Sequence, residues 1–217
     1  LLQGDVGSGK TIVALRAMLA VVDSGGQAAL LAPTEVLAQQ HFQNFRRLLG
    51  DLAEGGMLGG NAVGTQIGLL TGSMTQADKR SMQSAIASGE IGIVVGTHAL
   101  LSESVEFADL GLVVVDEQHR FGVEQRDALR GKASQPPHVL VMTATPIPRT
   151  VAMTIFGDLD VSTLRELPLG RSPITTHVVS AISKPQHLQR AWSRALEEIR
   201  QGHQVYIVAP RISANDD

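Results

Sequence analysis

Cysteine is absent from the 217-residue chain. This excludes a disulfide scaffold, thiolate zinc sites and a cysteine nucleophile, and it agrees with a reducing compartment. Aromatic side chains make up only 3% of the residues, which disfavours recognition of bases by aromatic stacking. The formal net charge is −3, so a uniformly basic coat for nucleic acid is excluded, whereas a local basic groove is not.

Long hydrophobic runs are also lacking. The uncharged stretch 55–77 is interrupted by Gly, Asn, Gln, Ser and Thr, whereas a membrane-spanning helix needs about 20 mostly apolar residues. The first residues, LLQ, show no positively charged signal region. With 43% apolar and 18% charged residues, we expect a soluble chain with a packed core and no membrane partner.

Short apolar runs alternate with helical patterns along most of the chain. The runs lie at 28–32, 66–70, 91–95, 112–115 and 139–142. They are almost continuously apolar, which is typical of strands covered on both faces. The helical patterns lie at 11–22, 36–49 and 76–88, the last with Ser73 or Thr75 as its cap and Gly89 as its end. This alternation predicts an α/β fold with a parallel, doubly wound sheet.

Two glycine- or proline-rich stretches interrupt this order. Residues 54–64 (EGGMLGGNAVG) predict a flexible surface insertion, for which we have no functional account. Residues 166–176 predict a linker, so that 1–165 form a first domain and 177–217 begin a second. In the second we expect strands at 176–180 and 204–209 around a helix at 184–202, whose apolar stripe includes Trp192 as a packing residue. We expect the chain to end before this second domain closes a core.

The first motif is a glycine loop, GDVGSGKT at 4–11, which matches G-x-x-x-x-G-K-[ST]. Glycines allow the backbone N–H groups to surround phosphate oxygens, and the helix that follows directs its N-terminal dipole at the same anion. Lys10 would reach the β- and γ-phosphates, and the Thr11 hydroxyl would hold Mg²⁺. The alternative is a glycine turn before an ordinary helix. The predicted nucleotide-binding residues are Gly4, Val6, Gly7, Ser8, Gly9, Lys10 and Thr11.

The second motif is an acidic pair, Asp116 and Glu117, at the end of a valine-rich run. A buried parallel strand delivers such residues to the carboxyl edge of the sheet, where ligands bind. Asp116 would hold Mg²⁺, mostly through water, and Glu117 would orient or deprotonate the attacking water. With Lys10 they form the predicted catalytic set. The alternative for the acidic pair alone is two solvated carboxylates.

A third motif, Thr143-Ala144-Thr145, also follows a predicted strand. Its hydroxyls could bond the acidic segment and relay its state. A threonine-rich turn before a helix is an equally good interpretation.

Together these segments resemble the superfamily 2 helicases. The resembling segments, in order, are GDVGSGKT (4–11), APTEVLAQQH (32–41), LTGS (70–73), GTHALL (96–101), DEQH with RFGVEQR (116–126) and TATPIPRT (143–150). Within the superfamily the chain is most similar to the RecG family of ATP-dependent DNA helicases. The Mfd family of transcription-repair coupling translocases is similar but is expected to have DEEH where this chain has Gln118.

The resemblance implies RecA-like domains, the first complete and the second only begun, and the cofactors ATP and Mg²⁺. It implies that Gln118 and His119 couple the nucleotide site to Thr143, Ala144 and Thr145. It further implies a DNA groove with mainly phosphate contacts, which are independent of sequence. The implied DNA-binding residues are Pro33, Thr34, Gly72, Ser73, Thr97 and His98. For His98 a turn histidine with satisfied hydrogen bonds is the alternative.

The RecG resemblance also implies a partner and a cellular place. The partner would be branched or forked DNA, such as stalled replication forks and Holliday junctions in recombination and repair. The motor would be monomeric, in the bacterial cytoplasm and associated with the nucleoid. The family's wedge domain, its adenine-reading segment and the rest of its second lobe have no counterpart here, so we expect this chain alone to be nearly inactive.

Other functions remain possible from the residues alone. A P-loop kinase or transporter ATPase would need a lid or a signature helix, and neither is visible. A nucleotide-gated binding module without turnover would be expected to have a degenerate acidic pair, and Glu117 argues against it.

Overall fold

The structure is a computed structural model that describes residues 1–55, 64–116, 136–145, 160–165, 175–180 and 183–208. The chain divides into two compact units, Leu1–Leu169 and Gly170–Asp217. The division falls within the linker predicted at 166–176. None of the helices in the described ranges is long and apolar enough to span a membrane.

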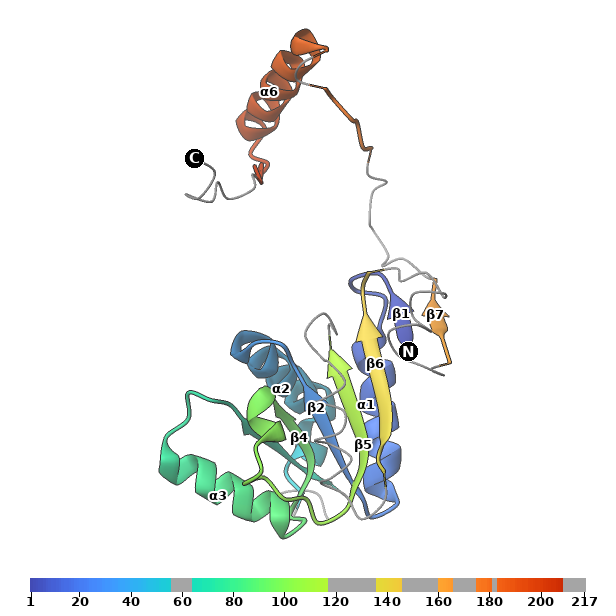
Figure 1. The fold of residues 1–217 in the computed structure, drawn as a ribbon, viewed down its shortest axis with the longest axis vertical. Coiled ribbons are helices and arrows are strands. Elements are labelled where there is room, and N and C mark those ends of the chain that lie inside the picture. Colours follow the sequence, from blue (N-terminus) through green and yellow to red (C-terminus); the bar gives the residue numbers. More distant parts are fainter. Residues whose placement is uncertain (56–63, 117–135, 146–159, 166–174, 181–182, 209–217) are drawn as a thin grey trace, which may run out of the picture. The chain divides into compact units, whose positions relative to one another are not determined.

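The first unit is built on a seven-stranded sheet in the order β3-β4-β2-β5-β6-β1-β7 (Figure 1). Every pair of neighbouring strands is parallel. The strands are β1 (Leu2–Gly4), β2 (Gln27–Leu31), β3 (Gln66–Leu70), β4 (Ile91–Gly96), β5 (Leu110–Asp116), β6 (His138–Thr143) and β7 (Ser162–Leu164). The predicted parallel α/β class is confirmed, and each of the five predicted strands is present.

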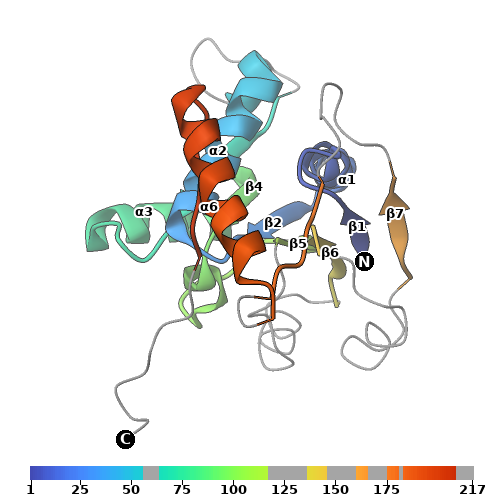
Figure 2. The ribbon, with the colours of Figure 1, turned by 90° about the horizontal axis from the view of Figure 1, so that it is seen from above.

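Helices cover both faces of this sheet. They are α1 (Lys10–Asp23), α2 (Glu35–Leu49) and α3 (Gln76–Ala87), with 3₁₀ turns η1 (Gly50–Ala53) and η2 (His98–Leu101). Residues of α1 and α2 pack in one core cluster, and Ile86 of α3 packs in the other. Figure 2 accordingly shows α1 and α2 on one side of the sheet. The fold is therefore doubly wound, as predicted.

The strand sequences explain this arrangement. In β2, Leu31 belongs to one cluster while Leu30 belongs to the other, and both are at most 3% exposed. In β5, Val113 and Val114 divide in the same way. Side chains of a strand alternate between its faces, so a sheet buried on both sides needs apolar residues at every position. The continuous runs in the sequence are the consequence.

Some details differ from the predictions. Thr75, not Ser73, caps α3, because its hydroxyl accepts a hydrogen bond from the Asp78 N–H at 3.2 Å. Strand β7 was not predicted, because Ser162–Leu164 is short and lacks an apolar run. The predicted insertion 54–64 lies mostly outside the described residues. Its described ends lie close together, since a Cβ on Gly55 would come within 2.2 Å of the Gly64 carbonyl oxygen.

The second unit contains the helix α6 (Pro185–Arg200), close to the predicted range. The prediction of strands at 176–180 and 204–209 is wrong, because residues 176–180 and 204–208 form no strand. A strand requires a neighbour for its hydrogen bonds, and the described residues of this unit offer none. The packing role predicted for Trp192 is likewise not met, because Trp192 is 49% exposed and the described residues of this unit include no strand that could cover the apolar stripe of α6.

Candidate functional site

The carboxyl ends of the parallel strands meet at one edge of the sheet, and this edge has two halves. One half joins the neighbouring strands β5, β6 and β1, and the other joins β3, β4 and β2. The glycine loop follows β1, Thr143 ends β6, and Asp116 ends β5. The residues implied in DNA binding follow the other three strands. The motifs predicted to bind the nucleotide and those predicted to bind DNA therefore lie on different halves of the sheet edge.

Strand register brings the three nucleotide-site motifs to the same level. Met142 pairs with Leu2 of β1 and with Asp116 of β5, and Thr143 pairs with Gln3. Adjacent strands lie about 4.8 Å apart, so Asp116 and Leu2, two residues before the glycine loop, are separated by about two such spacings. This separation fits a phosphate chain and a hydrated cation between them.

The glycine loop has a backbone that needs its glycines. Gly7 and Gly9 adopt φ values of 82° and 92°, in the left-handed region that other residues rarely occupy. At Gly4 a Cβ would come within 2.5 Å of the Ser8 hydroxyl and 3.0 Å of the Leu164 Cβ. The close approach of Ser8 and of β7 thus explains the first glycine, and backbone conformation explains the other two.

Polar groups of the loop are only partly satisfied. Lys10 Nζ donates to the carbonyl oxygens of Gly4 at 2.8 Å and Asp5 at 2.9 Å. The Ser8 hydroxyl is buried and, among the described residues, has no hydrogen-bond partner. A buried unpaired polar atom is unfavourable and requires an explanation. A bound anion within the loop would supply the missing partner.

Helix α1 adds its own donors to the loop. It begins after Gly9 with no side-chain cap and no acidic residue in its first turn. The first N–H groups of a helix have no partner within the helix and carry a partial positive charge. In α1 the N–H groups of Ile12 and Val13 bond the Gly9 carbonyl, at 3.0 and 3.2 Å. Among the described residues, the N–H groups of Lys10 and Thr11 have no such backbone partner, and these two are available to an external anion. The loop, Ser8 and α1 therefore fit a polyphosphate.

Asp116 does not stand alone at the end of β5. Its Oδ2 lies 2.6 Å from Nε2 of His41 on α2, and both side chains are largely buried, with 13% and 12% of their surface exposed. No role was predicted for His41, although it lies within the quoted segment 32–41. Helical spacing could have found it, because it lies three residues after Ala38 and four before Phe45, and both are fully buried.

Thr143 is fully buried at the end of β6. Its hydroxyl lies 2.9 Å from the Thr145 hydroxyl and accepts from the Thr145 N–H at 3.2 Å. Glu117, Gln118 and His119 lie outside the described residues. Coupling between these residues and the threonine motif therefore stays a prediction.

The DNA half of the edge presents small polar groups to solvent. Thr34, Gly72, Ser73 and His98 are exposed, and Pro33 and Thr97 are partly buried. The Thr34 hydroxyl caps α2 by accepting a hydrogen bond from the Leu37 N–H at 3.3 Å, which leaves its own O–H free to donate. The six residues follow three neighbouring strands, so the structure brings them to one side of the edge.

Glu35 ties two of these segments together, a role that the sequence analysis missed. Its Oε1 accepts from the Ser73 N–H at 2.9 Å, and Lys79 Nζ donates to the Gly72 carbonyl at 2.6 Å. Hydrogen bonding from the Ser73 side chain is the main reason that the pKa of Glu35 is lowered. The loop after β3 is thus held against the start of α2.

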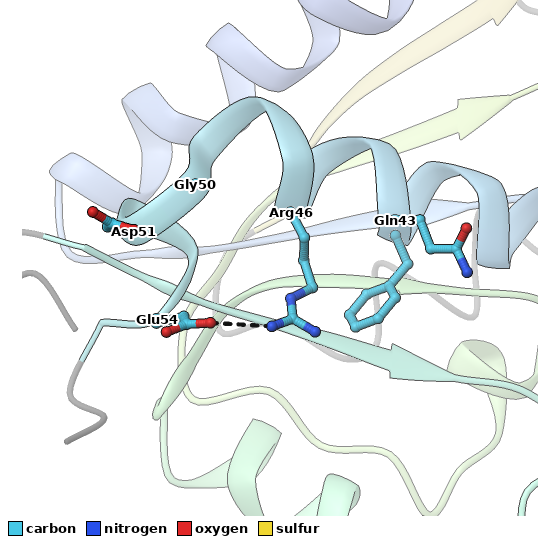
Figure 3. Close-up of a pocket in the computed structure, with 6 residues that line it drawn as sticks. Gln43, Arg46, Gly50, Asp51 and Glu54 are labelled. Atoms are coloured by element: carbon cyan, nitrogen blue, oxygen red, sulfur yellow. Dashed lines mark hydrogen bonds and ion pairs between the residues drawn. The ribbon is translucent and has the colours of Figure 1, made fainter. Parts of the chain in front are cut away.

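A surface hollow of about 520 Å³ lies over the second half of α2 (Figure 3). There Arg46 pairs with Glu54 at 3.2 Å and lies 5.8 Å from the centre of the Phe42 ring. The hollow contains none of the predicted site residues. Among the described residues that line it, the one cation, Arg46, is already paired with Glu54, so it does not compete with the sheet edge as the candidate site.

A cation at the sheet edge would depend on its ligand for coordination. Among the described residues, no group of three or more His, Asp or Glu side chains is placed to hold a metal ion. Mg²⁺ bound through one carboxylate, one hydroxyl, waters and phosphate oxygens needs no such group. Asp116 and Thr11 fit this mode of binding.

Comparison with known proteins agrees with these features. A family model for DEAD/DEAH box helicases matches residues 1–154. The protein named ATP-dependent DNA helicase RecG from Mycobacterium tuberculosis (strain ATCC 25618 / H37Rv) is 64% identical over 219 residues. The RecG of Streptococcus pneumoniae serotype 4 is 49% identical over 216 residues. Each match covers 100% of this chain and 30% of the relative, so the chain spans about a third of their length.

Solved structures show the same relationship. A structure of RecG bound to a three-way DNA junction is 37% identical, with a TM-score of 0.72 over 97% of this chain and 26% of the solved one. The helicase domain of Hef from Pyrococcus furiosus shares the fold, with 21% identity and a TM-score of 0.54 over 76% of this chain and 34% of the solved one. On its sequence, its sheet and its glycine loop, the chain belongs to the DEAD/DEAH box helicase family.

Proposed function

We propose that residues 1–165 form the ATP-binding motor lobe of a RecG-type DNA helicase, and that residues 177–217 begin its second lobe. The whole protein would use ATP hydrolysis to remodel branched DNA, such as stalled forks and Holliday junctions. The observation that carries the proposal is the half-edge formed by β5, β6 and β1, where an uncapped helix, an unpartnered Ser8 hydroxyl and Asp116 lie together.

The glycine loop would bind the phosphates of ATP. Lys10 Nζ would exchange its bonds to two loop carbonyls for bonds to β- and γ-phosphate oxygens. The N–H groups of α1 and the Ser8 hydroxyl would donate to the same chain of phosphates. Thr11 and Asp116 would hold Mg²⁺, which neutralises charge that develops on the phosphoryl oxygens. Glu117 would orient and deprotonate the attacking water.

Coupling and DNA binding would use the remaining motifs. Gln118 and His119 would pass the state of the nucleotide to Thr143, Ala144 and Thr145. Exposed hydroxyl and backbone groups on the other half-edge would contact DNA phosphates. Such contacts carry no sequence information, in agreement with a motor that moves along any sequence. The negative net charge is no obstacle, because only the groove must attract phosphate.

The RecG relatives support one partner for the whole protein. The solved RecG is described as bound to a three-way junction, which supports branched DNA as the partner of the whole protein. We propose a monomeric motor of the bacterial cytoplasm that associates with the nucleoid. A transcription-repair coupling translocase remains the second candidate from the sequence, but the relatives at 64% and 49% identity are named RecG.

The test is hydrolysis of ATP by the full-length protein that contains these residues, with and without a three-way junction. We expect the junction to stimulate hydrolysis. Glu117→Gln should retain nucleotide binding, measured with a fluorescent ATP analogue, and lose turnover about 10²–10⁴-fold. Nucleotide binding with no turnover in the parent protein would favour a nucleotide-gated binding module. Unchanged phosphate release in Glu117→Gln would remove Glu117 from its proposed role.

A further inference from the structure

The contact between His41 and Asp116 joins the two halves of the sheet edge. Asp116 ends β5 in the nucleotide half, whereas α2 follows β2 in the DNA half. Nε2 of His41 and Oδ2 of Asp116 lie 2.6 Å apart, a short hydrogen-bond distance.

The chemistry of the pair fixes its direction. An ionised carboxylate only accepts hydrogen bonds, so Nε2 of His41 is the donor and Oδ2 of Asp116 is the acceptor. Oδ2 is therefore occupied from the α2 side. Among the described residues, no hydrogen bond to Oδ1 is formed, so Oδ1 is the oxygen available to water or a cation.

Burial makes this contact an effective restraint. Both side chains are almost nine-tenths buried, and the imidazole also packs 6.1 Å, centre to centre, from the ring of Phe45. Phe45 is itself fully buried. An imidazole fixed by its helix and by an aromatic neighbour restricts the rotation of the carboxylate that it bonds. Groups that hydrogen-bond a ligating carboxylate in this way orient it toward the metal.

We propose that His41 is a positioning residue for Asp116, which it orients for binding of the cation that accompanies the nucleotide. The proposal rests on the proposed function, because it takes Asp116 as a metal-binding carboxylate. It differs from a purely structural role for His41 in one respect. A structural histidine would affect the stability of the fold, whereas a positioning histidine affects the affinity for the divalent cation.

Three variants of the full-length protein separate these roles. His41→Leu replaces the imidazole by an apolar side chain and removes the hydrogen-bond donor. His41→Gln keeps an N–H donor on a side chain of similar reach. Gln43→Leu is the matched control, because Gln43 is exposed on the same helix and lies over the hollow rather than at the sheet edge (Figure 3).

The primary measurement is binding of Mn²⁺, as a substitute for Mg²⁺, in the presence of a non-hydrolysable ATP analogue, followed by electron paramagnetic resonance. We expect His41→Leu to weaken Mn²⁺ binding about 10- to 100-fold, the range found when such orienting groups are removed. His41→Gln should recover part of that loss, and Gln43→Leu should match the parent protein. The Mg²⁺ concentration that gives half-maximal hydrolysis should shift in the same order.

Melting temperature completes the test. If His41→Leu lowers the melting temperature but binds Mn²⁺ as tightly as the parent, the proposal is wrong and His41 is structural. If His41→Leu does not fold, Mn²⁺ binding by His41→Gln decides the question. Binding by His41→Gln that is no tighter than binding by an Asp116→Asn variant would contradict the positioning role. A parent protein that binds no nucleotide would instead overturn the proposed function.

Discussion

The two halves of the sheet edge begin their helices differently. In the DNA half, α2 and α3 each start with a threonine cap, Thr34 and Thr75, and each has an acidic residue in its first turn, Glu35 and Asp78. In the nucleotide half, α1 starts after Gly9 with neither. All three helices follow parallel strands of one sheet, so the fold itself does not require the difference.

At the start of α1 the protein lacks interactions that would stabilise the helix, and this lack indicates a binding function. A threonine cap contributes about 1 kcal/mol, and an acid in the first turn contributes some tenths more. The start of α1 lacks both and also buries the unpartnered hydroxyl of Ser8. The groups left unpaired are the donors that a polyphosphate requires. In the DNA half, by contrast, a threonine hydroxyl already accepts from one first-turn N–H group of each helix, and exposed hydroxyls are left for weaker contacts.

The largest effect should come from Lys10→Ala, which tests the nucleotide half directly. Among the described residues, Lys10 Nζ bonds two loop carbonyls, which solvent can replace. We therefore expect little change in melting temperature and a loss of about 10²–10³-fold in kcat, as for removal of one transition-state donor. Steady-state hydrolysis by the full-length protein, with calorimetry as the control, measures both quantities. A variant that unfolds instead would make Lys10 a structural residue.

Gly4→Ala should have the next largest effect, on stability and on nucleotide binding together. The new Cβ would meet Ser8 Oγ at 2.5 Å and Leu164 at 3.0 Å, so the loop or β7 must move. Overpacking of this kind destabilises by about 1–3 kcal/mol. Gly25→Ala is the control for loss of stability without a clash, because Gly25 has φ 89°, where alanine is strained, but nothing lies within 4 Å of a Cβ at this position. Only Gly4→Ala should also weaken nucleotide binding, and equal losses of binding in both variants would contradict the close approach at Gly4.

Thr75→Ala should lower the stability of the protein, whereas Ser8→Ala should not. Thr75→Ala removes the cap of α3 and should lower the free energy of unfolding by about 1 kcal/mol. Ser8→Ala removes a buried hydroxyl without a partner, so stability should stay the same or rise. The same Ser8 variant should bind ATP less tightly. Denaturant titration without nucleotide measures the free energy of unfolding of both variants. Equal destabilisation by both substitutions would contradict the difference between the two halves of the sheet edge.

The smallest effect concerns pH and the contact of Glu35 with the loop after β3. The hydrogen bond from the Ser73 side chain lowers the pKa of Glu35, so the carboxylate form is the one that the fold favours. Its contribution is fully present above the ordinary pKa of about 4.5 and is lost as the pH falls through the lower pKa of the folded state. Protection of the Ser73 amide against hydrogen exchange should decrease over that acidic range. Glu35→Gln should make the protection independent of pH there.

The sequence predicted the sheet well because its strands are buried on both faces. Runs such as the valines of β5 leave no other arrangement for so many apolar side chains. Strand β7 has no such signal, because Ser162–Leu164 contains one apolar residue, and its pairing with β1 cannot be predicted from so short a segment. In the second unit the apolar segments at 176–180 and 204–208 look like strands, but a strand forms only beside a neighbour.

The candidate site likewise has some residues that a local sequence signal predicts and others that it does not. The glycine loop and the acidic pair are local motifs, in which residue type and spacing alone indicate the chemistry. His41 and Glu35 act on residues 75 and 38 positions away, through contacts that only the packing of α2 creates. Helical spacing marks His41 as inward-facing, but nothing local identifies Asp116 as its partner.

The most direct test of the account is an experimental structure of the full-length protein with Mg²⁺ and a non-hydrolysable ATP analogue. The account predicts the terminal phosphate beside Lys10 Nζ, the ion between Thr11 Oγ1 and Asp116 Oδ1, and the Ser8 hydroxyl bonded to the ligand. An analogue bound elsewhere, or an ion held without Asp116 while Lys10 stays on its own loop carbonyls, would contradict it.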